Sequence, residues 1–280
     1  MEWLDAFILG LVQGLAEYLP VSSSGHLQIF REILGIDLPN DVSLQFDIIL
    51  HAATVLSTIV VLWPLFKKLC IAFLSFKRDA DFWYVCKILV SCIPIAIVGF
   101  AFKDTIENTF NNMLVVGICL CITAALLCFA HYSDKIGGRM ISPDKGRDIG
   151  WWDSIVIGCA QALAVLPGLS RSGTTIATGI IIGDKRSKVA AFSFLMVIIP
   201  ILGEALLDLF KIVSGHESAA GGAEITAGTL IIGFFTAFIV GCCACKWMLS
   251  LVRRGKLVWF AIYCVAVGII CILWQTTVVD

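Results

Sequence analysis

Six long apolar segments constrain this chain more than any other feature of its sequence. Each is long enough to cross the hydrocarbon core of a bilayer as one helix, which takes roughly 20 residues. The segments are residues 48–66, 83–102, 113–132, 189–207, 227–247 and 257–275. Only 15% of the 280 residues are charged, whereas soluble domains carry about 25%. The sequence therefore predicts an all-α integral membrane protein with six transmembrane helices.

The chain also repeats itself at an offset of 148 positions. Nine of the 23 residues in the segment 3–25 are identical to those 148 positions later, and they include polar matches such as Asp5 with Asp153. Chance similarity between apolar segments rarely places Asp, Gln and Gly in register. We therefore expect one structural domain made of a first repeat (1–132), a cytoplasmic linker (133–150) and a second repeat (151–280).

Each repeat opens with a segment that is unsuited to crossing the membrane as one straight helix. An apolar run reaches Pro20 in the first copy and Pro167 in the second, and a stretch of Ser and Gly follows. Proline removes a backbone donor, and Ser and Gly favour turns. Non-helical backbone at membrane depth is tolerated only where protein buries it or where it lines a wet cavity. Both segments are predicted to be broken.

The basic residues indicate how these segments sit in the membrane, because cytoplasmic loops carry an excess of Lys and Arg. Fifteen of the 20 basic residues fall in four clusters: Lys67, Lys68, Lys77 and Arg78; Lys135, Arg139, Lys145 and Arg147; Lys185, Arg186 and Lys188; Lys246, Arg253, Arg254 and Lys256. Six spans put all four clusters in the cytoplasm only if residues 1–30 and 151–183 are re-entrant hairpins entering from opposite faces. We expect an inverted-topology repeat with both termini on the external side.

The first broken segment holds residues suited to chemistry. Gln13 and Glu17 are four apart and share one helix face, and a carboxylate in an apolar segment usually marks a functional site. His26 follows and can transfer a proton near neutral pH. The turn between them supplies Ser22, Ser23, Ser24 and Gly25. This copy is predicted to be the reactive half.

The second broken segment is suited to binding an anion. Arg171 aligns with Ser23 of the first copy, and its planar fork matches phosphate oxygens. The turn around it contains Gly168, Ser170, Ser172, Gly173 and Thr174. The helix after each turn would add its positive end. We expect a phosphate clamp here, with a simple pairing of Arg171 and Glu17 as the alternative.

Other polar residues give weaker signals. His51 is either adjacent to the site or interfacial, and Glu204 with Asp208 is expected to form a solvated or headgroup-facing pair. The twelve cysteines sit mostly inside apolar runs and are interpreted as packing residues. The net charge of −1 gives no argument for nucleic acid as a partner.

Two long motifs of the sequence resemble those of a known family. Residues 13–26 resemble (E/Q)GxxEFLPVSSTGH, and residues 167–173 resemble PGxSRSG, both of the bacterial undecaprenyl-diphosphate phosphatases, the bacitracin-resistance protein family. The resemblance implies a bacterial cytoplasmic (inner) membrane enzyme. It implies hydrolysis of undecaprenyl diphosphate, which recycles the lipid carrier for cell-wall synthesis and gives bacitracin resistance. Gln13, Tyr18 and Ser24 depart mildly from the motif.

The resemblance and the residue chemistry together suggest a division of roles. The expected catalytic residues are Glu17, Ser23, His26 and Arg171, and the expected substrate-binding residues are Gln13, Ser22, Ser24, Gly25, Gly168, Ser170, Ser172, Gly173 and Thr174. Ser23 would attack the terminal phosphorus while His26 protonates the leaving lipid phosphate. Glu17 would orient or deprotonate Ser23, or hold a divalent cation (Mg or Ca) together with Gln13.

Several alternatives stay open at this point. Ser22 is a second candidate nucleophile, and an activated water is a third. A flippase or transporter for polyprenyl phosphate would suit the inverted repeats equally well, and a structural membrane subunit is the least favoured reading. Membrane lipids are expected partners, and the sequence leaves a homodimer open.

Overall fold

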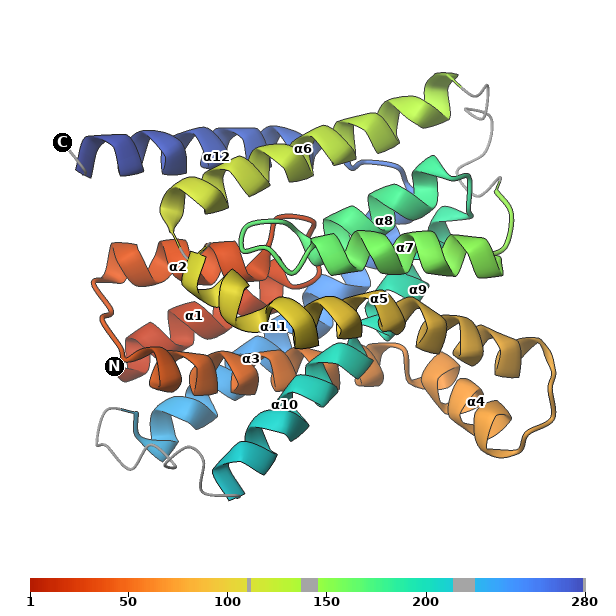
Figure 1. Ribbon diagram of the computed structural model, residues 1–280, viewed down its shortest axis with the longest axis horizontal. Coiled ribbons are helices and arrows are strands. Elements are labelled where there is room, and N and C mark those ends of the chain that lie inside the picture. Colours follow the sequence, from red (N-terminus) through yellow and green to blue (C-terminus); the bar gives the residue numbers. More distant parts are fainter. Residues whose placement is uncertain (110–111, 137–145, 214–224, 279–280) are drawn as a thin grey trace.

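The computed structural model describes residues 1–109, 112–136, 146–213 and 225–278. Within these ranges the chain folds into helices joined by turns, with one isolated bridge between Arg147 and Asp184 and no β-strand. The helices run mostly along the long axis of the molecule, and both termini lie at the same end (Figure 1). Six segments are long and apolar enough to cross a membrane. The predicted all-helical membrane protein with six spans is confirmed at this level.

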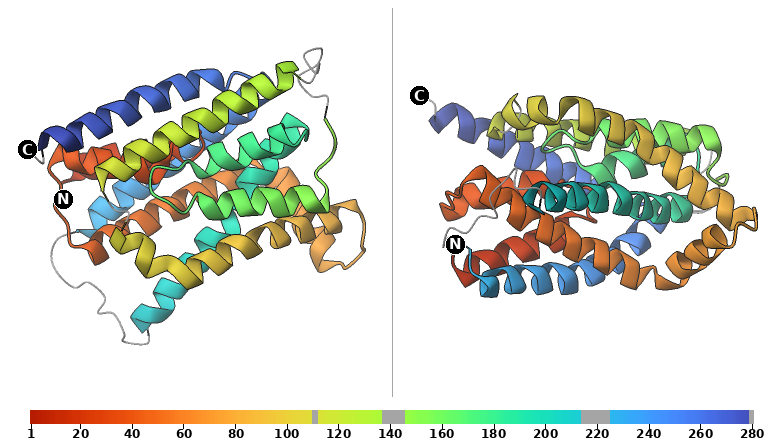
Figure 2. Two further views of the ribbon diagram at one scale, coloured as in Figure 1. Left: turned by 45° about the horizontal axis from the view of Figure 1, so that its top comes forward. Right: turned by 60° about the horizontal axis from the view of Figure 1, so that its bottom comes forward.

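The helices of the first half are α1 (Trp3–Ala16), α2 (Ser23–Leu34), α3 (Asn40–Val61), α4 (Trp63–Leu74), α5 (Ala80–Thr109) and α6 (Met113–Ile136). Those of the second half are α7 (Trp151–Leu163), α8 (Arg171–Ile181), α9 (Arg186–Met196), α10 (Ile198–Val213), α11 (Ala227–Arg253) and α12 (Val258–Val278). Helix α1 packs against α11, α7 packs against α5, and α12 runs beside α6 (Figure 2). Each half thus contributes helices to the packing of the other.

Two of the expected spans are divided. The first was expected over residues 48–66, but α3 ends at Val61 and α4 begins at Trp63, with Leu62 outside helical geometry (φ −97°, ψ 17°). The fourth was expected over residues 189–207, and it is split at Val197 into α9 and α10. A proline follows each break within the first turn of the next helix, where its missing N–H costs little.

Both opening segments are broken, as predicted. Helix α1 gives way to a turn that ends at Ser22, and α7 gives way to a turn that ends at Ser170. Each serine caps the next helix, because its Oγ accepts a hydrogen bond from the backbone N–H of Gly25 (3.3 Å) or Gly173 (3.0 Å). Ser22 has a φ of 72°, which is uncommon for a residue other than glycine.

The two turns touch one another. The Oγ of Ser172 donates a hydrogen bond of 3.2 Å to the carbonyl oxygen of Leu19. A Cβ atom on Gly25 would lie 3.0 Å from the Cα of Gly168, which itself has a φ of 87°. Glycine is therefore required where the two backbones approach, and the turns from the two halves form one unit near the middle of the molecule.

Arg147 ties together the two ends of the segment that holds α7 and α8. Its Nη2 donates to Oδ1 of Asp153 (2.6 Å), at the start of α7, and to the carbonyl of Ile182 (3.3 Å), just after α8. Its Nε lies 3.5 Å from Oδ1 of Asp184, whose side chain is fully buried. Burial and the nearby carboxylate of Asp153 raise the pKa of Asp184 to about 6.

Asp184→Asn is expected to stabilise the protein more at pH 8 than at pH 5. The pKa of Asp184 in the folded protein, about 6, lies above its ordinary value of 3.8. The folded state therefore binds more protons between these values, and ionisation destabilises it as the pH rises through 6, by at most about 3 kcal/mol. The measurement is thermal unfolding of the purified protein at both pH values.

The control is Asp148→Asn, which removes an exposed carboxylate paired with Lys185. It should change the unfolding temperature equally at pH 5 and pH 8. Equal stabilisation by Asp184→Asn at the two pH values would contradict the raised pKa.

Candidate active site

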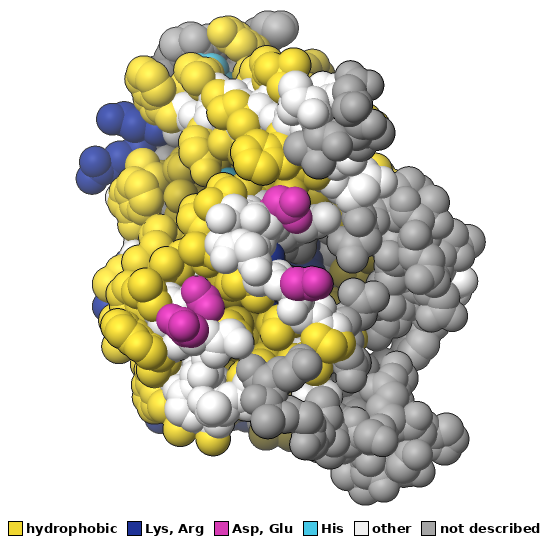
Figure 3. All heavy atoms as spheres, turned by 90° about the vertical axis from the view of Figure 1, so that its left-hand side faces the viewer, with side chains coloured by type: hydrophobic (Ala, Val, Ile, Leu, Met, Phe, Trp, Pro, Cys, Tyr) yellow, Lys and Arg dark blue, Asp and Glu magenta, His cyan; other side chains and the backbone are white. Residues whose placement is uncertain are grey.

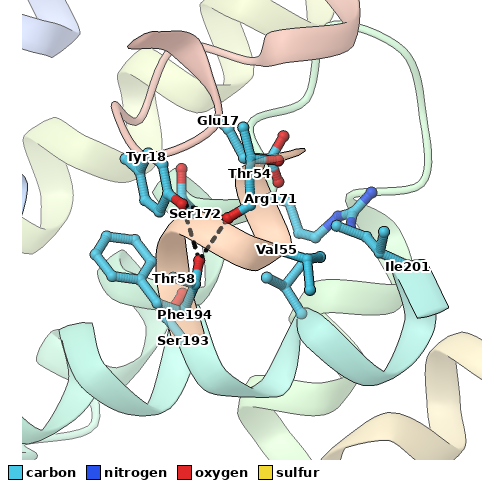
Figure 4. A pocket seen from close by; sticks show the side chains of 11 residues that line it. Glu17, Tyr18, Thr54, Val55, Thr58, Arg171, Ser172, Ser193, Phe194 and Ile201 are labelled. Carbon is cyan, nitrogen blue, oxygen red and sulfur yellow. Dashed lines mark hydrogen bonds between the residues drawn. The ribbon is translucent and has the colours of Figure 1, made fainter. Parts of the chain in front are cut away.

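A cleft opens where the end of α1 meets α3, α8, α9 and α10. Its lining residues are Glu17, Tyr18, Thr54, Val55, Thr58, Arg171, Ser172, Ser193, Phe194, Val197 and Ile201. Figure 4 shows that these side chains come from four separate parts of the chain, with Glu17 and Arg171 near one another. The break between α9 and α10 lies at Val197 and thus in the wall of the cleft. The cleft combines charged, hydroxyl and apolar surfaces.

Glu17 joins three of the residues singled out from the sequence. Its Oε2 accepts a hydrogen bond of 2.7 Å from Oγ of Ser23 and one of 3.0 Å from Nε2 of Gln13. The Glu17 side chain is only 9% exposed, so water competes little for these contacts. Ser23 is the first residue of α2. The carboxylate is therefore placed to take the proton of the Ser23 hydroxyl.

Arg171 is the first residue of α8 and lines the same cleft as Glu17. Its Nε is buried without a hydrogen-bond partner, and no carboxylate of the described residues forms an ion pair with it. Its positive charge nevertheless acts on the carboxylate of Glu17. Because α2 and α8 both begin in this region, their positive ends add to the attraction for an anion. Ser23 is not among the residues that line the cleft and is linked to it through its hydrogen bond to Glu17. The arrangement suits a phosphate group held by Arg171 beside Glu17.

His51 lies beside the carboxylate of Glu17. Its Nε2 is 3.6 Å from Oε2 of Glu17, and its side chain is 19% exposed. Its Nδ1 donates a hydrogen bond of 2.8 Å to the carbonyl oxygen of Asp47, one turn earlier on α3. The sequence left His51 either site-adjacent or interfacial, and the structure places it beside the site.

His26 does not line the cleft. Its Nδ1 donates to the carbonyl oxygen of Ser22 (2.8 Å), and its Nε2 lies 2.8 Å from the hydroxyl of Tyr263 on α12. A carbonyl oxygen can only accept, so Nδ1 carries the hydrogen and the neutral ring accepts the Tyr263 hydrogen at Nε2. Both ring nitrogens are thus engaged outside the cleft. This geometry supports a role in holding the Ser22 turn.

The remaining expected binding residues shape the two turns. Ser172 lines the cleft, whereas Ser22 and Ser170 act as helix caps and Ser24 is exposed. Thr174 is buried, and its hydroxyl has no hydrogen-bond partner within the described residues. Gly25, Gly168 and Gly173 lie where the two turns approach each other. Their contribution is to the shape of the site.

The expected divalent cation at Glu17 and Gln13 stays a prediction. Gln13 has a buried Oε1 without a hydrogen-bond partner, but the described residues contain no group of three or more His, Cys, Asp or Glu that could hold a metal ion. A cation here would take most of its oxygen ligands from the substrate or water. The expected pair of Glu204 and Asp208 falls on side chains outside the described residues.

Sequence reasoning missed most of the cleft wall. Thr54 and Thr58 line the cleft, and together with His51 they recur three to four residues apart on one face of α3. Polar residues at this spacing within a membrane span are a usable signal. The hydroxyl of Tyr18 donates to the carbonyl of Thr54 (2.6 Å) and contacts the hydroxyl of Thr58 (2.8 Å). Tyr18 departs from the motif, and its hydroxyl therefore has hydrogen-bond partners inside the protein.

Comparisons with known proteins agree with the motifs. The family model described as bacitracin resistance protein BacA matches residues 6–270. A protein of Parabacteroides distasonis named undecaprenyl-diphosphatase is 51% identical over 273 residues, which cover 97% of this chain and 98% of the relative. Proteins of the same name from Bacteroides fragilis and Halothermothrix orenii are 51% and 36% identical, each covering 98% of both chains. The chain therefore belongs to the bacitracin resistance protein BacA family.

Proposed function

We propose that this protein hydrolyses undecaprenyl diphosphate to undecaprenyl phosphate and inorganic phosphate. The observation that carries the proposal is the 2.7 Å hydrogen bond from Ser23 Oγ to Glu17 Oε2, because Glu17 lines the same cleft as Arg171. Relatives that match nearly the whole chain are named for this activity. Their name is that of a hydrolase, so the flippase reading is not favoured. The product would return the lipid carrier to cell-wall synthesis.

In the proposed first step, Ser23 attacks the terminal phosphorus. The Ser23 O–H bond breaks and its proton moves to Glu17, while a bond forms between Oγ and phosphorus. The bond from phosphorus to the bridging oxygen breaks, and its electron pair stays on the lipid phosphate. Water then attacks the phosphoserine, which releases inorganic phosphate and restores the serine hydroxyl. An activated water that attacks directly is the alternative, and it would leave no phosphoserine.

The charges around the cleft fit this step. Arg171 would hold the phosphate oxygens, and the N-terminal ends of α2 and α8 would stabilise the charge that spreads over them. The leaving group is a phosphate monoester whose second pKa is about 6, so it departs without a strong acid. This explains how the reaction can proceed although both ring nitrogens of His26 are engaged in hydrogen bonds, one with the carbonyl oxygen of Ser22 and one with the hydroxyl of Tyr263.

The apolar part of the cleft suits the first units of an isoprenoid chain. Val55, Val197 and Ile201 line it together with Phe194, which meets the ring of Tyr18 edge to face. A headgroup bound between Glu17 and Arg171 would thus be followed by a hydrocarbon surface. This order matches a lipid diphosphate better than a soluble phosphate ester.

The proposed membrane arrangement is an inverted repeat with two re-entrant hairpins, α1–α2 in the first half and α7–α8 in the second. Its support is the reciprocal packing: α1 lies on α11 and α7 lies on α5, so each hairpin packs against the corresponding long helix of the other half. The end that carries both termini displays Asp and Glu side chains around a recess (Figure 3). That end would face outward, and the membrane would be the bacterial inner membrane.

The deciding experiment is phosphate release by purified, detergent-solubilised protein given undecaprenyl diphosphate. We expect steady release of inorganic phosphate without any membrane gradient, and the absence of release would sink the proposal. A pure flippase would release none. Parallel reactions with a chelator, and with Mg²⁺ or Ca²⁺ added back, test the predicted cation separately.

Tyr263→Phe is expected to lower kcat about 3- to 10-fold, the worth of one hydrogen bond. The change removes the donor to His26 Nε2, so the ring and the Ser22 turn that it holds lose one constraint. Steady-state kinetics of phosphate release measure the effect. Tyr132→Phe, on α6 outside the site, is the matched control and should leave kcat unchanged. An equal loss in both variants would argue against this role of Tyr263.

A further inference from the structure

Most of the hydroxyl groups that line the cleft have already committed their hydrogens to the backbone. A hydroxyl has one hydrogen to donate, and a phosphate offers only acceptor oxygens. Four lining residues donate to backbone carbonyl oxygens: Tyr18 and Thr58 to that of Thr54 (2.6 and 3.0 Å), Thr54 to that of His51 (2.8 Å), and Ser172 to that of Leu19 (3.2 Å). None of the four can serve a phosphate without giving up a carbonyl.

Ser193, on α9, is the exception among the hydroxyl residues of the cleft wall. It is 5% exposed, and its one hydrogen-bond partner within the described residues is Oγ1 of Thr175, at 2.5 Å. A serine inside a helix often donates to the carbonyl one turn earlier, but Ser193 does not. Thr175 donates its own hydrogen to the carbonyl oxygen of Arg171 (2.8 Å). The hydrogen of Ser193 is therefore directed to Thr175 and to no carbonyl.

The hydrogen bond between Ser193 and Thr175 can reverse its direction without any movement of the backbone. Hydroxyl hydrogens rotate about the C–O bond to suit their partners. If Ser193 turns its hydrogen into the cleft, Thr175 can turn its own hydrogen to Oγ of Ser193. The carbonyl of Arg171 then keeps its hydrogen bond within helix α8. No polar group is left unpaired, so the exchange costs little.

Ser193 is placed beside the part of the cleft that suits a phosphate. Arg171 and Thr175 are one turn apart on α8, so the contact with Thr175 holds Ser193 against the turn that carries Arg171. The next residue, Phe194, belongs to the apolar part of the wall, and Figure 4 shows both side chains in the lining of the cleft. Ser193 thus stands where the charged and the apolar surfaces meet.

We propose that Ser193 is a substrate-binding residue that donates a hydrogen bond to a phosphate oxygen of the lipid diphosphate. Thr175 stands behind it as the partner that keeps its oxygen paired. This inference rests on the proposed function, because it requires a phosphate beside Arg171. Ser193 lies outside both sequence motifs, and no bond of its own is made or broken in the reaction. A contact made equally in the ground state and the transition state lowers KM and leaves kcat unchanged.

The first test is the kinetics of phosphate release by Ser193→Ala. Loss of a hydrogen bond to a charged group should raise KM for undecaprenyl diphosphate about 10- to 100-fold, with kcat changed less than about threefold. Ser193→Thr keeps the hydroxyl and should recover most of the loss. Ser91→Ala is the matched control, because this buried serine of α5 donates to the carbonyl of Ile88 outside the cleft. An equal rise of KM in the control would overturn the assignment.

The second test measures binding without turnover. Undecaprenyl phosphate and inorganic phosphate are titrated separately into wild type and Ser193→Ala, and the rise in unfolding temperature reports the affinity. Weakening of about tenfold is expected for undecaprenyl phosphate if Ser193 contacts the lipid-side phosphate, and for inorganic phosphate if it contacts the terminal one. Unchanged affinity for both ligands would overturn the contact, whatever the change in KM.

A variant that keeps the shape of the side chain guards against misfolding. If Ser193→Ala fails to fold, Ser193→Cys decides on the same measurements, since a thiol is a weak donor. The binding test also separates this inference from the proposed function. A wild type that binds both phosphates but releases none would overturn the hydrolysis alone, and weaker binding by Ser193→Ala would still support the contact.

Discussion

Replacing Arg171 by alanine is expected to lower kcat/KM for undecaprenyl diphosphate by about 1000-fold. The guanidinium lines the cleft with its Nε buried and without a hydrogen-bond partner, so its donors are available to a substrate phosphate. Removing it takes away both a bidentate contact and the charge that offsets the growing negative charge at phosphorus. The measurement is the initial rate of phosphate release at several concentrations of lipid diphosphate.

Arg171→Lys shows which property of the side chain matters. Lysine keeps the charge but loses the planar fork, so we expect an intermediate loss of about 10- to 100-fold. Arg254→Ala, at the end of α11 away from the cleft, should leave kcat/KM unchanged. If Arg171→Ala loses less than about tenfold, the phosphate is held elsewhere and the clamp assigned to α8 is wrong.

Ser23→Ala is expected to lower kcat about 10³-fold or more, with little change in KM. The hydroxyl that donates to Glu17 would be gone, and no covalent intermediate could form. Phosphate release gives the rate, and phosphoserine in acid-quenched wild-type protein gives the intermediate. Ser133→Ala, on α6 outside the cleft, is the matched control for loss of a hydroxyl.

The Ser22 alternative is tested in parallel. Ser22→Ala removes a cap whose Oγ accepts the Gly25 N–H, so it should weaken activity by loosening the turn yet still allow phosphoserine to form at Ser23. Near-normal release by Ser23→Ala would favour an activated water. In that event Arg171→Ala should still weaken substrate binding.

The helical architecture could be predicted from the sequence because bilayer thickness sets the length of a span. The six spans are all present, and the turns that contain Pro20 and Pro167 were visible as proline followed by Ser and Gly, although the helices end four residues before these prolines. The interruption at Val197 was not predicted, because Pro200 alone does not say whether a helix kinks or restarts. Only the packing of α9 and α10 around the cleft decides that.

The candidate site could be predicted where its residues lie close together in the sequence. Gln13 lies on α1, Glu17 at its end, and Ser23 at the start of α2 after a short turn, so their contacts join residues that are close in the sequence. The partner of His26 is 237 positions away on α12, and no pattern within the motif indicates whether the ring points into the cleft or away from it. The contact between His51 and Glu17 depends on the packing of α3 against α1. Contacts of this kind are set by tertiary structure.

The contact between the two turns has a consequence for how the enzyme matures. Glu17 and Arg171 are 154 positions apart, and they line one cleft only when the Gly25 and Gly168 backbones are in place against each other. A nascent chain that ends before α8 would carry Ser23, the proposed nucleophile, without Arg171, the proposed phosphate clamp. Such distant contacts form late in folding because of the entropy lost on closing a long loop. Hydrolytic competence would thus arise only after α8 has inserted, so partly synthesised chains would be inert toward the lipid pool.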